Sequence, residues 1–318
     1  MRRADDPYCA PLAVSADGML DVGDGHHIYW TDSGAGIPMI TCHGGPGGAM
    51  MVGAARFTDG HRVRHIMFDQ RGCGRSAPRG RLEANSLQHT VADMERLRRH
   101  LGIERWIVSG GSWGSTVALA YAEAHPERCL GLFLVSLWLC RKADTDWWFH
   151  GVQTLFPELW ESFAAMVPEA ERGDLRDAYC RRILGDDADV AARLATSLFL
   201  YEEGFMHFDA PIAPPDPGRG ADYGRIFAHY AAHDFFVDDD TLLRHADRLA
   251  AIPVSIITGR YDCCTPPSNA WALARRLPHA RLEIVPGAGH YPTEPAFGHA
   301  VARAAQDFVG HIERELGR

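Results

Sequence analysis

The first 140 residues alternate between short apolar runs and segments with helical spacing, and this alternation limits the folds open to the chain. Apolar runs that we expect to be strands lie at residues 26–30, 38–42, 63–68, 106–109 and 130–137. Helical spacing of apolar side chains occupies residues 86–102 and 116–124. Strands that alternate with helices form parallel sheets through crossover connections. The sequence therefore predicts an α/β fold with a mostly parallel sheet flanked by helices.

The middle of the chain breaks this pattern. Strand signals vanish from about residue 138 to residue 236, where helical, aromatic-rich segments surround a proline-rich loop at residues 210–220. The alternation then returns, with expected strands at 252–259 and 281–287, a helix at 266–277 and a closing helix from about Glu294. We therefore expect residues 1–137 and 237–318 to form the core and residues 138–236 to form an inserted helical cap that selects substrate.

Charge and composition exclude several classes of function. The formal net charge of −9 disfavours nucleic acid, because phosphate binding needs basic surface, and also disfavours anionic membranes. The longest apolar run, residues 130–140, is too short to span a bilayer, and no signal peptide is recognisable. The eight cysteines are scattered without metal-ligand spacing, so we expect reduced thiols in a cytoplasmic protein. Nothing in the sequence indicates the oligomeric state.

The stretch SGGSWGS, residues 109–115, lies between an expected strand and an expected helix. Gly110, Ser112 and Gly114 within it fit the pattern G-x-S-x-G. In this context the pattern indicates a nucleophile held on a sharp turn, where glycines permit the tight backbone. The N-terminal N–H groups of the following helix favour negative charge that develops nearby. Ser112 is therefore the candidate nucleophile, although the motif alone is also compatible with a structural glycine turn.

A serine hydroxyl needs a base to remove its proton, and the sequence offers one downstream. Asp262 follows one expected strand and His290 follows the next, and parallel strands keep their ligand crevice at these carboxyl ends. The chain order Ser112, Asp262, His290 is one of the known orders of a serine triad. We predict that these three residues are catalytic. Serine acyl transfer needs no metal or cofactor, so none is expected.

The reaction also needs hydrogen-bond donors for the developing oxyanion. The stretch HGGPGG, residues 43–48, follows the strand at residues 38–42. A backbone N–H of Gly44 or Gly45, together with that of Trp113, would form the oxyanion hole. Loss of one such donor typically raises the barrier by about 3 kcal/mol.

Taken together, four stretches resemble the prolyl iminopeptidases, a group of serine peptidases with the α/β-hydrolase fold. These stretches are HGGPGG, DQRGCGRS at 69–76, GGSWGSTVALAYAEAHP at 110–126 and GAGHYP at 287–292. The resemblance covers both pieces of the core. It implies an α/β-hydrolase fold with an inserted helical cap and removal of an N-terminal residue, typically proline, from a peptide.

The resemblance also implies that acidic residues of the cap hold the free α-amino group of the substrate. The segment SLFLYEEG, residues 197–204, is similar to one of the family's acidic segments, with Glu202 or Glu203 as the match. A second segment usually reads like ARIENHYF, and here its counterpart is GRIFAHYA, residues 224–231. Phe227 stands where the family has glutamate, so one anchor is kept, one is lost, and the pocket is expected to be more apolar.

Three functions remain open on this reading. The first is an aminopeptidase that removes proline, alanine or a similar small N-terminal residue from a small peptide or aminoacyl-amide substrate. The second is an amide or ester hydrolase that removes an aminoacyl group from a hydrophobic natural product, which the Phe227 replacement favours. The third is a non-catalytic binding protein, since a fold alone does not prove activity.

Overall fold

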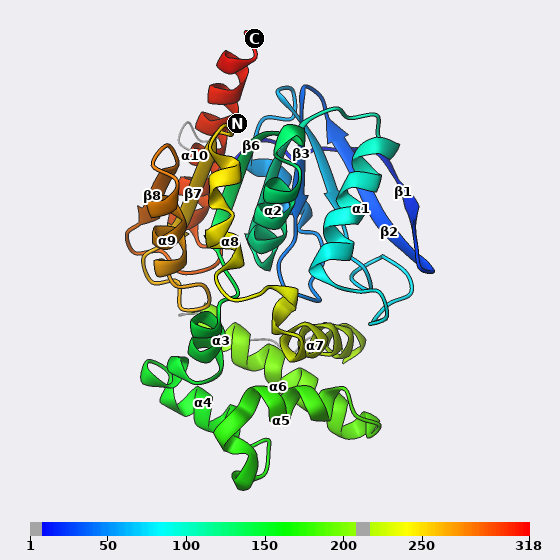
Figure 1. Ribbon diagram of the computed structural model, residues 1–318, viewed down its shortest axis with the longest axis vertical. Coiled ribbons are helices and arrows are strands. Elements are labelled where there is room, and N and C mark those ends of the chain that lie inside the picture. Colours follow the sequence, from blue (N-terminus) through cyan, green and yellow to red (C-terminus); the bar gives the residue numbers. More distant parts are fainter. Residues whose placement is uncertain (1–7, 208–216) are drawn as a thin grey trace.

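The computed structural model describes residues 8–207 and 217–318, and its centre is an eight-stranded sheet (Figure 1). The strands are β1 (Val14–Gly23), β2 (His26–Gly34), β3 (Ile37–Cys42), β4 (Val63–Phe68), β5 (Trp106–Ser112), β6 (Cys129–Leu137), β7 (Val254–Gly259) and β8 (Arg281–Val285). Their spatial order is β1-β2-β4-β3-β5-β6-β7-β8, and every pair from β4 to β8 is parallel. The predicted mostly parallel sheet is confirmed.

The antiparallel edge of the sheet contains a strand that the sequence pattern did not reveal. β1 pairs antiparallel with β2, which in turn pairs antiparallel with β4. Most of β1 is exposed, including Met19 at 47%. A strand of this kind lacks the apolar alternation that sequence reading depends on, because only one of its positions, Val22, is buried.

Helices cover both faces of the sheet and enclose two apolar cores. The helices of the core are α1 (Leu87–His100), α2 (Trp113–Ala124), α8 (Thr241–Arg244), α9 (Ser268–Arg276) and α10 (Pro295–Glu315). α10 packs on β6, β7 and the 3₁₀ helix η1 (Val52–Phe57), and its apolar residues share a core with Met39, Ile107 and Phe133 of the sheet. α1, α2 and α9 contribute to the larger core on the opposite face. We call the face of the sheet that α10 covers the α10 face.

The remaining helices lie together at one end of the sheet, below it in Figure 1. They are α3 (Lys142–Phe149), α4 (Pro157–Ala164), α5 (Leu175–Ile183), α6 (Ala188–Met206) and α7 (Pro217–Ala232). Buried aromatic rings pack them together: the ring of Phe163 stacks on Tyr179 and Tyr201 with centroids 4.1 and 4.0 Å away. This layer faces the ends of the strands where β5 and β6 lead into the site described below.

The expected proline-rich loop at residues 210–220 is partly wrong. Residues 210–216 lie outside the described residues, whereas residues 217–220 form the first turn of α7. Proline is favoured at the first position of a helix, because its missing N–H would have no partner there and its φ is already helical. Pro217 therefore begins a helix here and does not extend the loop.

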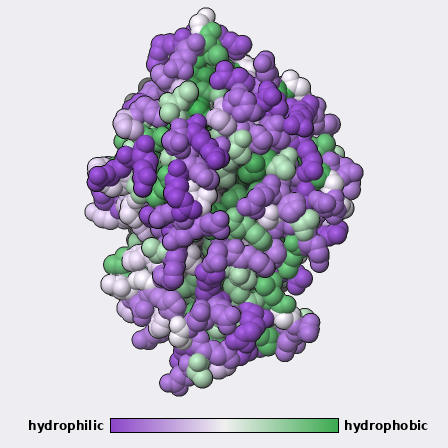
Figure 2. All heavy atoms as spheres, in the orientation of Figure 1, coloured by the Kyte–Doolittle hydropathy of each residue, from purple (hydrophilic) through white to green (hydrophobic). Residues whose placement is uncertain are grey.

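Hydrophilic residues predominate on the face of the molecule shown in Figure 2. Within the parts of the chain that the structure describes, no helix combines the length and apolar character needed to cross a bilayer.

Glu123, in the last turn of α2, is a buried carboxyl group with an unusual environment. Only 5% of the residue is exposed, and its Oε1 atom has no hydrogen-bond partner among the described residues. Burial raises the pKa of Glu123 to about 8, although the charge of Arg248 opposes the shift. The folded protein therefore holds this carboxyl group neutral at pH 7.

This environment predicts a stability that depends on pH. Between about pH 4.5 and 8 the unfolded chain loses the Glu123 proton while the folded protein keeps it, so this group's contribution to stability falls as pH rises. Glu123→Gln removes the ionisation. We expect the free energy of unfolding of the variant to be higher than that of the wild type. The difference should be on the order of 2 kcal/mol at pH 8 and much smaller at pH 5.

Urea unfolding at the two pH values measures this difference. Glu127→Gln, an exposed residue just beyond α2, is the matched control and should show no such change. An equal effect of Glu123→Gln at both pH values would contradict the buried neutral carboxyl.

Candidate active site

Ser112 lies at the point where β5 ends and α2 begins. Its backbone has φ 56° and ψ −131°, a conformation that a residue with a side chain rarely adopts. Strain of this kind persists only where the surroundings impose it, and it is common at active sites. Ser112 is the last residue of β5, and it lines a cavity of about 460 Å³. The expected strand, turn and helix around SGGSWGS are present.

The two outer glycines of the motif allow close backbone contacts. A Cβ atom at Gly110 would lie 2.0 Å from the carbonyl oxygen of Gly114, and one at Gly114 would lie 2.1 Å from that of Cys42. Both distances are far below van der Waals contact, so no other residue fits. The second contact joins the turn to the end of β3, where the candidate oxyanion loop begins.

The loop after β3 places its glycines against Ser112. A Cβ at Gly44 would be 3.8 Å from Ser112 Oγ, and Gly44 and Gly45 both line the cavity. Trp113 is the first residue of α2, and the first N–H groups of a helix have no intrahelical partner. The side chain of Trp113 points elsewhere, since its indole is fully buried. The structure thus brings the three expected donor residues to the nucleophile.

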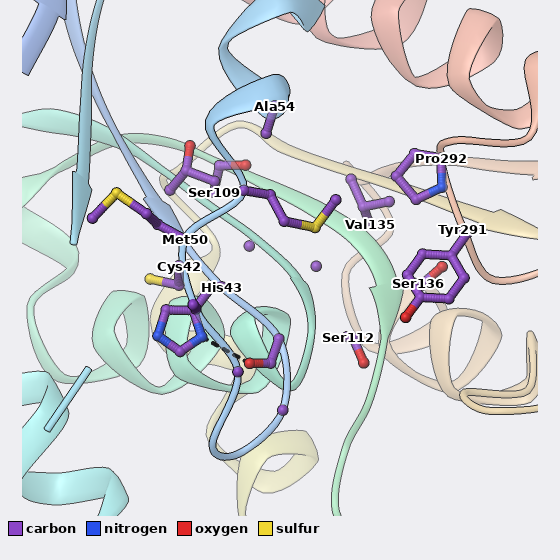
Figure 3. Close-up of a pocket in the computed structure, with 18 of the residues that line it drawn as sticks. Cys42, His43, Met50, Ala54, Ser109, Ser112, Val135, Ser136, Tyr291 and Pro292 are labelled. Carbon is purple, nitrogen blue, oxygen red and sulfur yellow. Dashed lines mark hydrogen bonds between the residues drawn. The ribbon is translucent and has the colours of Figure 1, made fainter. Parts of the chain in front are cut away.

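Gln70, from the DQRGCGRS stretch, connects this loop to the turn. Its backbone N–H donates to His43 Nε2 at 3.0 Å, and its side-chain amide donates to the His43 carbonyl at 2.9 Å. Its Oε1 accepts a hydrogen bond from Trp113 Nε1 at 2.9 Å. Since His43 Nε2 accepts, the proton lies on Nδ1, which donates to the Gly44 carbonyl at 2.7 Å (Figure 3). Gln70 is a positioning residue that the sequence reading did not single out.

Asp262 and His290 follow β7 and β8 and lie in direct contact. His290 Nδ1 is 2.9 Å from each carboxylate oxygen of Asp262. The backbone N–H groups of Cys264 and Thr265 donate to Asp262 Oδ1, and the Thr265 hydroxyl donates to Oδ2. The carboxylate is therefore fixed from three sides, which in turn fixes the imidazole with its Nε2 available.

The pKa of His290 reflects two opposing effects. Burial alone would lower it, but the adjacent Asp262 carboxylate, with smaller contributions from Glu202 and Glu203, raises it above its ordinary value. Ser112 and His290 line the same cavity. A serine and a carboxylate-oriented imidazole in one cavity are the groups that acyl transfer requires.

Glu202 and Glu203 reach this cavity from α6. Glu202 accepts a hydrogen bond from the Tyr223 hydroxyl, and burial raises the pKa of Glu202 to about 7 even though that hydrogen bond opposes the shift. Glu203 accepts from the Tyr291 hydroxyl at 2.8 Å and lies 3.1 Å from His207 Nε2. Two adjacent carboxyl groups of the cap thus face the candidate nucleophile.

Phe227 does not line the cavity, contrary to the expectation for it. Its side chain is 1% exposed and packs inside the cap, with ring centroids 5.1 Å from Trp148 and 5.8 Å from Phe235. Tyr223, one turn earlier on α7, lines the cavity instead. Phe227 therefore belongs to the aromatic core of the cap, and the polar group that α7 presents to the cavity is the Tyr223 hydroxyl.

Other lining residues were not identified from the sequence. Tyr291 follows the candidate base directly, so its place in GAGHYP was a usable signal. Phe199 and Met206 share the cavity face of α6 with Glu202 and Glu203, at helical spacing. Among the residues that the structure describes, no group of three or more His, Cys, Asp or Glu side chains could hold a metal ion.

Comparisons with known proteins agree with this fold. The family model for the alpha/beta hydrolase fold matches residues 37–295, so the chain belongs to the α/β hydrolases. A solved structure of a proline iminopeptidase from Mycobacterium smegmatis superimposes with a TM-score of 0.62 at 21% identity, covering 95% of this chain and all of that one. At that identity the likeness establishes the fold.

Relatives with curated sequences show to which family of α/β hydrolases the chain belongs. A probable proline iminopeptidase from Leptolyngbya boryana is 39% identical over 308 residues, covering 94% of this chain and 95% of the relative. A proline iminopeptidase from Xylella fastidiosa is 41% identical over 300 residues, covering 92% and 96%. The chain is therefore a member of the proline iminopeptidase family, and the resemblance seen in the four motifs is confirmed.

The site geometry predicts how the reactivity of Ser112 depends on pH. A fluorophosphonate that labels activated serines should react more slowly as pH falls through the pKa of His290, because a protonated imidazole cannot accept the serine proton. The Glu203 carboxylate raises that pKa. Glu203→Gln should therefore move the midpoint of the labelling profile to lower pH, on the order of half a pH unit.

Labelling rates measured across the neutral range test this shift. Glu158→Gln, on the exposed surface of α4, is the control and should leave the midpoint in place. A midpoint that does not move in Glu203→Gln would contradict electrostatic coupling between the cap and the base.

Proposed function

We propose that this chain is a serine aminopeptidase of the prolyl iminopeptidase type. It would hydrolyse the amide bond after a free N-terminal residue, proline, alanine or a similar small one, through an acyl-enzyme. One observation carries the proposal: the cavity lined by Ser112 and His290 is also lined by Glu202 and Glu203. Among the described residues that line this cavity there is no Lys or Arg. Such a site favours a substrate with a positive charge close to the bond that breaks.

The proposed reaction uses each residue in a defined role. Ser112 Oγ attacks the carbonyl carbon while His290 Nε2 takes the hydroxyl proton, and Asp262 holds the imidazole in the required tautomer. The backbone N–H groups of Gly44 or Gly45 and of Trp113 stabilise the oxyanion. When the C–N bond breaks, the leaving amine takes the proton from His290. Water, deprotonated by His290, then attacks the acyl-enzyme. As the bond to Ser112 Oγ breaks, His290 returns the proton to Oγ and the amino acid is released.

The two glutamates support recognition of the α-ammonium group. A buried ammonium is costly unless a carboxylate pairs with it, and Glu202 is buried beside Glu203. A neighbouring cation favours the ionised form of Glu202, whose pKa of about 7 leaves it partly protonated in the free protein. The hydrogen bonds from Tyr223 and Tyr291 fix both carboxyl groups before substrate arrives.

A second function, hydrolysis of an amide or ester of a hydrophobic aminoacyl compound, has an observation of its own. Much of the cavity lining beyond the two glutamates is apolar, including Met50, Phe57, Met67 and Phe133. This lining can bind more hydrocarbon than an alanyl or prolyl group offers.

For the cellular setting we propose the cytoplasm. The seven cysteines other than Cys9 are buried and form no disulfide among the described residues. Proteins of oxidising compartments usually pair their cysteines. The proposed substrate is a small peptide or an aminoacyl amide.

The proposal predicts a strong preference for free amines. We expect kcat/KM for alanyl and prolyl arylamides to exceed that for their N-acetylated forms roughly ten- to a hundredfold, since an anchored charge contributes about 1.5–3 kcal/mol. Glu202→Gln and Glu203→Gln should each reduce this ratio. Ser112→Ala should abolish turnover and supplies the blank.

The matched control is Glu161→Gln, an exposed acid on α4 that does not line the cavity, and it should keep the ratio. Equal rates for free and acetylated substrates would overturn the aminopeptidase and leave general amide or ester hydrolysis. Full activity of Ser112→Ala would show that the nucleophile is another residue.

A further inference from the structure

The cavity does not end at Ser112 but continues below the candidate oxyanion loop. Its lining includes six residues of the sheet: Met39, Thr41, His65, Met67, Ser109 and Phe133. Of these, Met39, His65, Ser109 and Phe133 lie three or four residues before the end of their strand. Ser109 precedes Ser112 by three residues, which at strand geometry is about 10 Å. We call this inner part, with the residues that line it, the inner branch.

Strand register shows that the inner branch runs along one face of the sheet. Thr41 pairs with Met67 and with Ser109, and Ser109 pairs with Phe133, so these four residues form one row across β4, β3, β5 and β6. Met39 and His65 form the next row, two residues deeper. Since alternate residues of a strand share a face, both rows lie on one side of the sheet, and Met39 and Phe133 place it on the α10 face.

Small side chains leave this space open. Ala305 of α10 and Ala54 of η1 form the outer wall, and Ser109 lies on the inner one. In Figure 3 Ala54 lies above the cavity and Ser112 below it, with Ser109 to the left and Val135 to the right. Larger residues at these three positions would fill the gap between sheet, η1 and α10, as interiors normally are filled.

The inner branch is uncharged, with apolar side chains beside the hydroxyl groups of Thr41 and Ser109 in its first row and His65 in the deeper row. Its lining in the described chain contains no Asp, Glu, Lys or Arg. His65, 3% exposed, lies in the deeper row with Nε2 2.6 Å from the Thr58 hydroxyl, and its Nδ1 has no partner among the described residues. Burial lowers the pKa of His65 to about 4, so the ring is neutral.

The position of the branch relative to the base identifies the part of the substrate that enters it. His290 follows β8, at one edge of the sheet, and must contact the leaving group to protonate it. The branch begins beside Phe133 of β6 and extends under β5 to β3 and β4, and this β3 and β4 part lies on the other side of Ser112 from His290. The leaving group therefore faces away from the branch, and the side chain of the acyl residue faces it.

We propose that the inner branch is a subsite for an unbranched aliphatic side chain on the acyl residue, so that the enzyme accepts long linear aminoacyl groups as well as small ones. This inference rests on the proposed aminopeptidase function and names its substrate class more closely. The α-ammonium group would pair with Glu202 and Glu203 while the chain passes beneath the oxyanion loop toward His65.

A series of arylamides of alanine, norvaline, norleucine and 2-aminooctanoate tests the subsite. For the wild type we expect kcat/KM to rise about fourfold for each CH₂ that enters the branch, through norleucine at least. Ala305→Met and Ala54→Leu should each lower the norleucyl-to-alanyl ratio of kcat/KM at least tenfold. Ala54 is only partly buried, so its variant remains informative if Ala305→Met does not fold.

Val52→Leu is the matched control. Val52 lies on the same 3₁₀ helix as Ala54, is 55% exposed and does not line the cavity, so the ratio should stay at the wild-type value. A wild-type rate that is flat or falls with chain length would overturn the subsite, as would a gain that survives both plugging substitutions.

Alanyl anilides with and without a para-hexyl chain form a second arm of the experiment. A gain from that chain that Ala305→Met removes would assign the branch to the leaving group and overturn the proposal.

A parallel series of p-nitrophenyl esters from acetate to octanoate separates the two proposals, because these esters lack an amine. If arylamides are not cleaved but ester rates rise with chain length and fall in the plugged variants, the aminopeptidase fails and the subsite stands. If alanyl arylamide is cleaved with a free-amine preference but no series depends on chain length, the function stands and the subsite fails.

Discussion

The contact between the serine turn and the end of β3 is the constraint on which the site depends. Gly114 lies so close to the Cys42 carbonyl that a single methyl group would force the two segments apart. That contact sets the distance from Ser112 to Gly44, and hence the geometry in which an oxyanion could be bound. Gln70 then locks the same pair of segments with hydrogen bonds to His43 and Trp113. A displacement of about 1 Å here could cost a hundredfold in rate.

Electrostatics couples the cap to the core. The Asp262 carboxylate is buried and makes hydrogen bonds with Cys264, Thr265 and His290. The cap adds two more carboxyl groups, which raise the pKa of His290. A positively charged substrate would neutralise them and thereby lower the pKa of the base, which leaves more of it in the form that can accept a proton. Binding of substrate and readiness of the base are then linked through Glu202 and Glu203.

The cavity has a polar part and an apolar part. Its outer part carries the carboxyl groups and tyrosines of the cap, and its inner branch lies in the core on the α10 face. The two parts meet at Ser112. A substrate with an ammonium group and an aliphatic chain on the same carbon could occupy both at once, which explains why one site can combine buried charge with a long apolar extension.

The sequence by itself determined the parallel part of the sheet, the turn and the positions of Ser112, Asp262 and His290. Each of these features is signalled locally, by an apolar strand pattern, by glycines or by a polar residue that directly follows a strand. Parallel strands then bring the residues that follow them to one edge of the sheet.

Only the tertiary structure decided the remaining features. Tyr223 and Phe227 are four residues apart on one side of α7, so helical periodicity cannot say which of them reaches the cavity. β1 is exposed and shows little pattern, and Glu123 is buried only because α2 packs in the core. The inner branch exists because Ser109, Ala54 and Ala305 meet across three elements far apart in sequence. A cavity is the space left between side chains, and no local pattern records it.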